Sequence, residues 1–145
     1  MRMSSGREVR GLDHLNKVIG DLGLSEYAKV RILGSMIKVE VRYDPLERER
    51  RTLNSCRAQL KSLNSQNDMV SGQLIQQIDQ LLRRTELARI ERVLVTAPSP
   101  DGVKLLEEQL VSIQKEIIYR RVEVNELKRL VRLFLSYVRE YLRGA

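Results

Sequence analysis

Two long segments of the chain carry apolar residues at intervals of seven, and this spacing constrains the fold more than any other feature. In the first segment these positions hold Leu46, Leu53, Leu60, Asn67, Leu74, Leu81 and Ala88, of which Asn67 is polar. In the second segment they are Val103, Leu110, Ile117, Val124, Val131 and Val138. Apolar residues three places further on complete most of the pairs, as in a coiled-coil seam. The pattern predicts long helices over 44–94 and 103–143.

The stretch VTAPSPDG, residues 95–102, predicts a turn between these helices because it combines two prolines with an Asp-Gly pair. Asp44 and Pro45 are typical of a helix start, and Asp101 is a candidate cap for the second helix. Two long helices joined by a short turn fold back as an antiparallel hairpin. We therefore predict a mainly α fold built on a long coiled-coil hairpin.

The composition agrees with seam packing. Aromatic residues make up 4% of the chain, with one Phe and no Trp. Compact cores depend on aromatic bulk, whereas helix seams are built from Leu, Ile and Val. The composition therefore favours helical seams over a compact α/β core.

The N-terminal part is predicted to be a flexible stretch over 1–10, followed by a small helical subdomain over 11–43. We expect this subdomain to pack at the base of the hairpin, beside residues 46–65. Residues 28–43 are ambiguous, because a turn at Gly34-Ser35 would also make a β-hairpin that places Lys29 opposite Glu40. A helix is favoured slightly, since an isolated two-stranded hairpin is marginally stable.

Three polar residues interrupt the seams and are candidates for setting register or oligomeric state: Asn67, Gln77 and Arg120. In an antiparallel hairpin, Gln77 and Arg120 fall in one layer, where the amide oxygen can accept from the guanidinium group. Asn67 has no polar partner in this register. It is therefore a candidate to face the same residue of a second chain in a homodimer or higher oligomer.

The end of the second helix carries more apolar residues than a two-helix seam uses. The candidates for a protein-interaction surface are Leu130, Leu133, Leu135, Tyr137 and Leu142. A second apolar stripe needs a second partner. That partner is either the N-terminal subdomain or another protein.

The chain has a formal net charge of +7, which raises the question of an acidic partner. Glutamates are interspersed with the basic residues throughout, as on a solvated helix surface. One local cluster at the predicted base could bind phosphates; it comprises Arg48, Arg50, Arg51, Arg57, Arg139 and Arg143.

Residues with catalytic potential are sparse. His14 is the only histidine, and Cys56 is the only cysteine and falls on the seam. Nucleophilic, acid-base or metal chemistry needs more than one such group together. We expect no catalytic, cofactor or metal site. With neither a secretory signal nor an apolar membrane span in the sequence, we expect a cytoplasmic protein, or a nuclear one in a eukaryote.

The pattern therefore predicts a non-enzymatic coiled-coil structural or adaptor protein, which assembles with itself or with other proteins through its seam and apolar base. In length, basic balance and helical-hairpin form, it is similar to the stalk proteins of flagellar and type III export ATPases. The alternative is a nucleic-acid-associated protein of the DNA-packaging or chromatin type that uses the arginine cluster. Its short N-terminal part and hairpin resemble the small terminase subunits of phages.

Overall fold

A computed structural model of the chain describes residues 4–64 and 69–144, with residues 4–9 and 64 described by their backbone only. The elements in chain order are α1 (Ser4–Asp21), β1 (Ala28–Leu33), β2 (Met36–Tyr43), α2 (Glu47–Asn64), α3 (Met69–Leu87), β3 (Ile90–Thr96) and α4 (Pro100–Gly144). The prediction of a mainly helical protein with a long C-terminal helix is confirmed, since α4 has 45 residues.

The chain divides into two compact units. The sheet unit consists of Met1–Tyr43 and Ile90–Tyr119, and the helical unit consists of Asp44–Arg89 and Arg120–Ala145. The first part of α4 belongs to the sheet unit and the remainder to the helical unit. The helical unit is thus formed by the segment between β2 and β3 together with the C-terminal part of α4.

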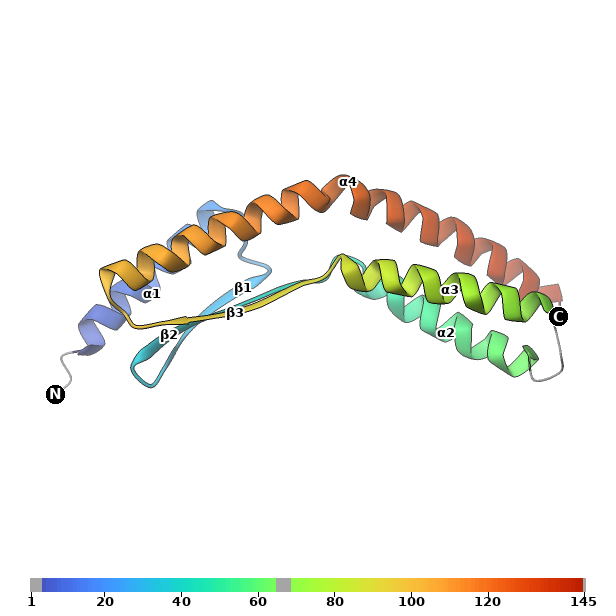
Figure 1. Cartoon of the computed structure of the whole chain (residues 1–145), viewed down its shortest axis with the longest axis horizontal. Coiled ribbons are helices and arrows are strands. Elements are labelled where there is room, and N and C mark those ends of the chain that lie inside the picture. Colours follow the sequence, from blue (N-terminus) through green and yellow to red (C-terminus); the bar gives the residue numbers. More distant parts are fainter. Residues whose placement is uncertain (1–3, 65–68, 145) are drawn as a thin grey trace. The chain divides into compact units, whose positions relative to one another are not determined.

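The sheet unit contains a three-stranded antiparallel sheet with β2 between β1 and β3 (Figure 1). Gly34 has a φ of 64° in the two-residue turn between β1 and β2, a conformation that glycine adopts without steric cost. Lys29 pairs with Glu40, which is the register of the β-hairpin alternative. The preference for a helix over 28–43 is therefore wrong. The third strand supplies the support that an isolated hairpin lacks.

The core of the sheet unit lies between one face of the sheet and two helices. Alternate residues of β2, from Ile37 to Tyr43, are buried. They share a cluster with residues of α1 and of the first part of α4, including Leu15, Leu106 and Leu110. Both helices therefore cover the same face, and the other face of the sheet carries the exposed residues of the alternation.

Two local signals set the helix ends in the sheet unit. Gly23, with a φ of 71°, ends α1, and the amide of Leu24 donates to the carbonyl of Ile19 as in a Schellman motif. At the start of α4, the Oγ of Ser99 accepts from the amide of Gly102 over 3.0 Å. Ser99 is thus the N-cap and Pro100 occupies the first helical position, in place of the predicted cap at Asp101.

The helical unit is a bundle of α2, α3 and the C-terminal part of α4. α2 and α3 pack side by side and run in opposite directions (Figure 1). The buried core comprises Leu46, Leu53, Cys56, Leu60, Leu74, Ile78, Leu81, Val124, Leu127, Val131, Leu135 and Val138. Most of these residues belong to the predicted intervals of seven. They therefore pack in a three-helix bundle, and a coiled-coil hairpin is not observed.

The structure differs from the prediction at two further points. Residues 44–94 do not form one helix, because α3 ends at Leu87 and residues 90–94 lie in β3. The N-terminal region shares its core with 90–119, the segment around the predicted turn, and belongs to a different unit from the start of α2. The physical reason is that the strand β3 offers β2 a hydrogen-bonded partner, which the hairpin prediction did not consider.

Candidate protein-interaction surface

His14 and Cys56 lie in different units. His14 Nε2 lies 3.1 Å from Glu107 Oε2, a pair between α1 and α4 that is about half exposed. Cys56 is buried in the helical unit, and its burial raises the pKa of the thiol, with Arg139 opposing this rise. No group of three or more metal-binding side chains occurs within residues 10–63 and 69–144.

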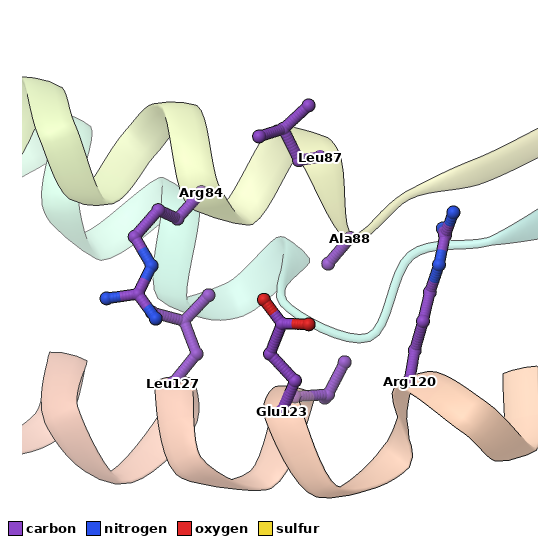
Figure 2. Close-up of a pocket in the computed structure, with 7 residues that line it drawn as sticks. Arg84, Leu87, Ala88, Arg120, Glu123 and Leu127 are labelled. Atoms are coloured by element: carbon purple, nitrogen blue, oxygen red, sulfur yellow. The ribbon is translucent and has the colours of Figure 1, made fainter.

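The cavity in Figure 2 lies between α3 and α4 of the helical unit and has a volume of about 70 Å³. Its lining comprises Arg84, Leu87, Ala88, Arg120, Glu123, Val124 and Leu127. Sites for small molecules usually have volumes of about 300 to 1,000 Å³. This cavity is too small for an organic cofactor.

Two larger depressions lie on the surface of the sheet unit. One, of about 340 Å³, is bordered by His14 of α1 and by Pro98, Ser99 and Pro100 at the start of α4. The other, of about 290 Å³, is lined by Lys104, Glu107, Glu108 and Val111. His14 and Ser99 both border the first depression, but Ser99 Oγ accepts from the Gly102 amide as the N-cap of α4, and His14 Nε2 lies beside Glu107 Oε2. Both depressions are open to solvent. The remaining candidates lie on the outer surfaces of the two units.

An exposed apolar surface of the helical unit lies on α4. Val122, Leu130, Leu133 and Tyr137 are 76%, 42%, 67% and 60% exposed, respectively. Their spacing places them on one face of a helix with 3.6 residues per turn. The core residues of α4, such as Val131 and Val138, lie on the other side. We call these four exposed residues the α4 outer face.

The predicted interaction residues divide between this face and the interior. Leu130, Leu133 and Tyr137 belong to the α4 outer face, whereas Leu135 is buried in the bundle core. Leu142 is half-buried against the same core. Val122 was not predicted, because the predicted surface was confined to the end of the helix. The residue seven places after Val122 is Arg129, so Val122 does not belong to an apolar repeat of seven. Leu130 lies eight places after Val122, which puts both residues on one face of a helix and could have indicated that Val122 belongs to the same surface.

Gln77 and Arg120, two of the three predicted register residues, lie in different surroundings. Asn67 lies outside the described residues, and Gln77 is exposed on α3. Arg120 Nη1 donates to the backbone carbonyl oxygen of Arg89 over 3.3 Å, just beyond the end of α3. The pairing of Gln77 with Arg120 is wrong, because it assumed one continuous helix facing α4.

Most members of the predicted arginine cluster already have carboxylate partners. Arg50 pairs with the buried carboxylate of Asp44 and with Glu86, 3.2 Å away. Three further pairs are Arg51–Glu47, Arg57–Asp79 and Arg143–Glu140, at 3.1, 2.7 and 3.3 Å. Arg48 and Arg139 are exposed. These ion pairs neutralise much of the cluster's charge.

The cluster is also spread along the bundle. Arg48, Arg50 and Arg51 lie near the start of α2. The last turns of α4 lie at the other end, where the Tyr141 hydroxyl is 3.4 Å from Ser71 Oγ near the start of α3 (Figure 1). Arg143 is therefore separated from the first three arginines. The structure does not assemble the six residues into one patch.

No family model, curated protein or solved structure matches the chain. A search of the described helices for one that is both long and apolar enough to span a membrane also found none.

Proposed function

We propose that this protein is a non-enzymatic helical adaptor that assembles with itself or with another protein through the α4 outer face. One observation carries the proposal: Val122, Leu130, Leu133 and Tyr137 are exposed on one side of a helix whose other side is already packed. Contiguous exposed apolar residues on a soluble protein mark interaction sites more often than scattered ones do.

The arrangement of the α4 outer face favours a helical partner. Leu130, Leu133 and Tyr137 are separated by three and four residues, the spacing by which one helix packs into the side chains of another. Glu126 and Glu140 border them, and each has an arginine one turn further on, Arg129 and Arg143, at 3.2 and 3.3 Å. An apolar centre with a polar, locally neutral rim is typical of protein interfaces.

The nucleic-acid alternative has weaker support. It depends on a concentrated field of positive charge that can replace the counterions of phosphates. Four of the six arginines in the predicted cluster pair with carboxylates, and the six lie at different ends of the bundle.

A pair of matched double variants tests the adaptor proposal. Leu133→Glu with Tyr137→Glu puts two negative charges on the α4 outer face. The control, Asn125→Glu with Ser136→Glu, adds the same charge at exposed polar positions of α4. Light scattering after size exclusion, over a wide range of protein concentration, measures the mass. We expect an oligomer that the first variant dissociates and the control retains, with equal helicity by circular dichroism.

Two outcomes would weigh against this proposal. An oligomer that survives in the Leu133→Glu, Tyr137→Glu variant would show that the α4 outer face makes no contact between chains. A monomeric wild-type chain would exclude self-assembly. The two variants would then be compared for proteins that copurify from the source cells, and a partner kept equally by both would exclude the α4 outer face.

A further inference from the structure

The sheet unit has an exposed surface that the adaptor proposal does not use. Both helices of this unit cover one face of the sheet. The other face, which we call the open face, consists of Lys29, Arg31, Leu33, Met36, Lys38, Glu40, Arg42, Glu91, Val93 and Val95. An antiparallel sheet can leave one face in water, and such a face is normally polar. The open face departs from this expectation.

Basic residues surround Glu40 on the open face. Lys29 is its cross-strand partner on β1, and Arg31 hydrogen-bonds to its carboxylate. Lys38 Nζ lies 3.4 Å from Glu40 Oε1. Arg42 follows on β2, opposite Glu91 of β3. Four basic against two acidic residues leave the open face with an excess of two positive charges.

Beside these charges lies an apolar strip. Val93 and Val95 of β3 are 63% and 51% exposed, and they are the cross-strand partners of Glu40 and Lys38. Leu33 and Met36, which face each other next to the β1–β2 turn, are 61% and 37% exposed. The open face is thus basic along β1 and β2, and apolar along β3 and at the turn.

We propose that the open face binds an amphipathic helix of a partner protein, with acidic residues beside its apolar stripe. Carboxylates of that helix would lie over the basic residues, and its apolar side chains would cover Val93 and Val95. Three strands about 4.8 Å apart span roughly 10 Å, which is about the diameter of a helix. A helix there would give the sheet a layer on both faces, a common solution for burying apolar sheet surface.

Charge and chemistry disfavour two other occupants. A second copy of the open face would bring like charges together, which costs affinity at an interface. A nucleic acid would use the basic residues but not the apolar strip. Moreover, the described residues of the open face include no aromatic side chain on which bases could stack. The combination of charge and apolar surface fits an acidic amphipathic helix.

Two synthetic peptides and a DNA duplex test this inference on the full-length protein. The first peptide has about 20 residues and is held as a helix by a cross-link between side chains. It carries one leucine stripe with glutamates beside it. The second replaces each glutamate by lysine. Binding is followed through the backbone amide signals of the labelled protein by NMR. We expect only the acidic peptide to bind, with the largest shifts in β1, β2 and β3.

The matched variants change the same number of charges. Lys29→Glu with Lys38→Glu should raise the Kd of the acidic peptide at least about tenfold. A tenfold change in Kd corresponds to roughly 1.4 kcal/mol of binding free energy. Lys115→Glu with Arg121→Glu, at exposed positions of α4, should leave it unchanged. Val93→Asp with Val95→Asp should also weaken it, because the apolar strip is lost. A retained amide spectrum shows that each variant is folded.

Three results would overturn the inference. The first is failure of the acidic peptide to bind more tightly than the lysine peptide, and the second is shifts that map outside the open face. The third is binding of the duplex that Lys29→Glu with Lys38→Glu abolishes, which would make the open face a nucleic-acid surface. The Leu133→Glu, Tyr137→Glu variant should bind the acidic peptide normally, so the two proposals can fail separately.

Discussion

Arg120 Nη1 donates a hydrogen bond to the backbone carbonyl oxygen of Arg89, 3.3 Å away. This bond joins α4 to the segment that follows α3, inside the helical unit. It gives a partner to a backbone carbonyl group that lies beyond the hydrogen bonds of the helix. Arg120 therefore stabilises the segment after α3, a role that its seam position alone did not indicate.

Replacing Arg120 by methionine should lower the free energy of unfolding by about 1 kcal/mol, the usual net contribution of one hydrogen bond. Methionine keeps an unbranched apolar stem, so the loss reports on the guanidinium group. Urea denaturation measures it. The control is Arg121→Met at the exposed neighbouring position, and equal losses in the two variants would contradict this role for Arg120.

Leu135 and Leu133 should respond differently to truncation. Leu135 is 5% exposed and Leu133 is 67% exposed, although both lie in the same turn of α4. Leu135→Ala leaves a cavity in the bundle and should cost about 2 to 5 kcal/mol. Leu133→Ala should change stability by less than about 0.5 kcal/mol. Thermal unfolding compares them, and a reversed order would place the wrong face of α4 against the core.

The identity of the residue that caps the N-terminus of α4 can be tested by substitution. Ser99→Ala removes the side-chain acceptor for the Gly102 amide and should cost about 1 kcal/mol. Asp101→Asn removes only a charge from the first turn and should cost about 0.5 kcal/mol. Chemical denaturation followed at the helical signal measures both. A larger effect at Asp101 would mean that Asp101, and not Ser99, caps the helix.

Gly102 is predicted to tolerate no side chain. A Cβ atom there would lie 2.4 Å from Thr96 Oγ1 and 2.6 Å from the Ala97 carbonyl oxygen. Since the backbone must move, Gly102→Ala should destabilise the sheet unit by about 1 to 3 kcal/mol. The control is Gly20→Ala in α1, whose Cβ would come no closer than 3.9 Å to another residue. That change should stabilise the protein by about 0.5 to 1 kcal/mol.

The carboxylate of Glu40 should titrate below its usual range. The hydrogen bond from Arg31 lowers the pKa of Glu40, with weaker help from Lys38 and some opposition from desolvation. A pKa lower in the folded than in the unfolded state means that the contribution of Glu40 to stability is present above the unfolded pKa. That contribution is lost as the pH falls through the folded pKa.

Replacing Arg31 by methionine should raise the pKa of Glu40 towards its ordinary value. An NMR titration of the side-chain carboxyl carbon measures the change. Arg129→Met, which removes the partner of Glu126 in the helical unit, is the control and should leave Glu40 unaffected. An unaltered Glu40 titration in the Arg31→Met variant would show that this ion pair does not form in solution.

The β1–β2 hairpin shows how far local patterns reach. The alternation around Gly34-Ser35 contained the observed register, including Lys29 opposite Glu40. What it lacked was evidence of stability, because a two-stranded hairpin has too little apolar surface to bury alone. That evidence came from β3, which begins 47 residues after β2 ends. A pairing over such a distance leaves no mark in either local pattern.

The candidate surfaces were predictable to different degrees. Leu130, Leu133 and Tyr137 were identifiable from the sequence. A helix with two apolar stripes either leaves the second stripe exposed or packs it against a second partner. The open face was not identified, because whether Val93 and Val95 are exposed depends on which side of the sheet the helices cover. IERVLVT, which is rich in β-branched residues, was the signal that could have revealed β3.

The sequence by itself determined the helical content, the long C-terminal helix and the periodic apolar faces, because these depend on residues within a few turns of one another. Only the tertiary structure decided that the apolar residues spaced seven apart in the first segment build a three-helix bundle. It also decided that the N-terminal region packs with residues 90–119. The physical reason is that a heptad seam specifies a buried face but not its partner. The partner is decided by contacts distant in sequence, here the pairing of β3 with β2.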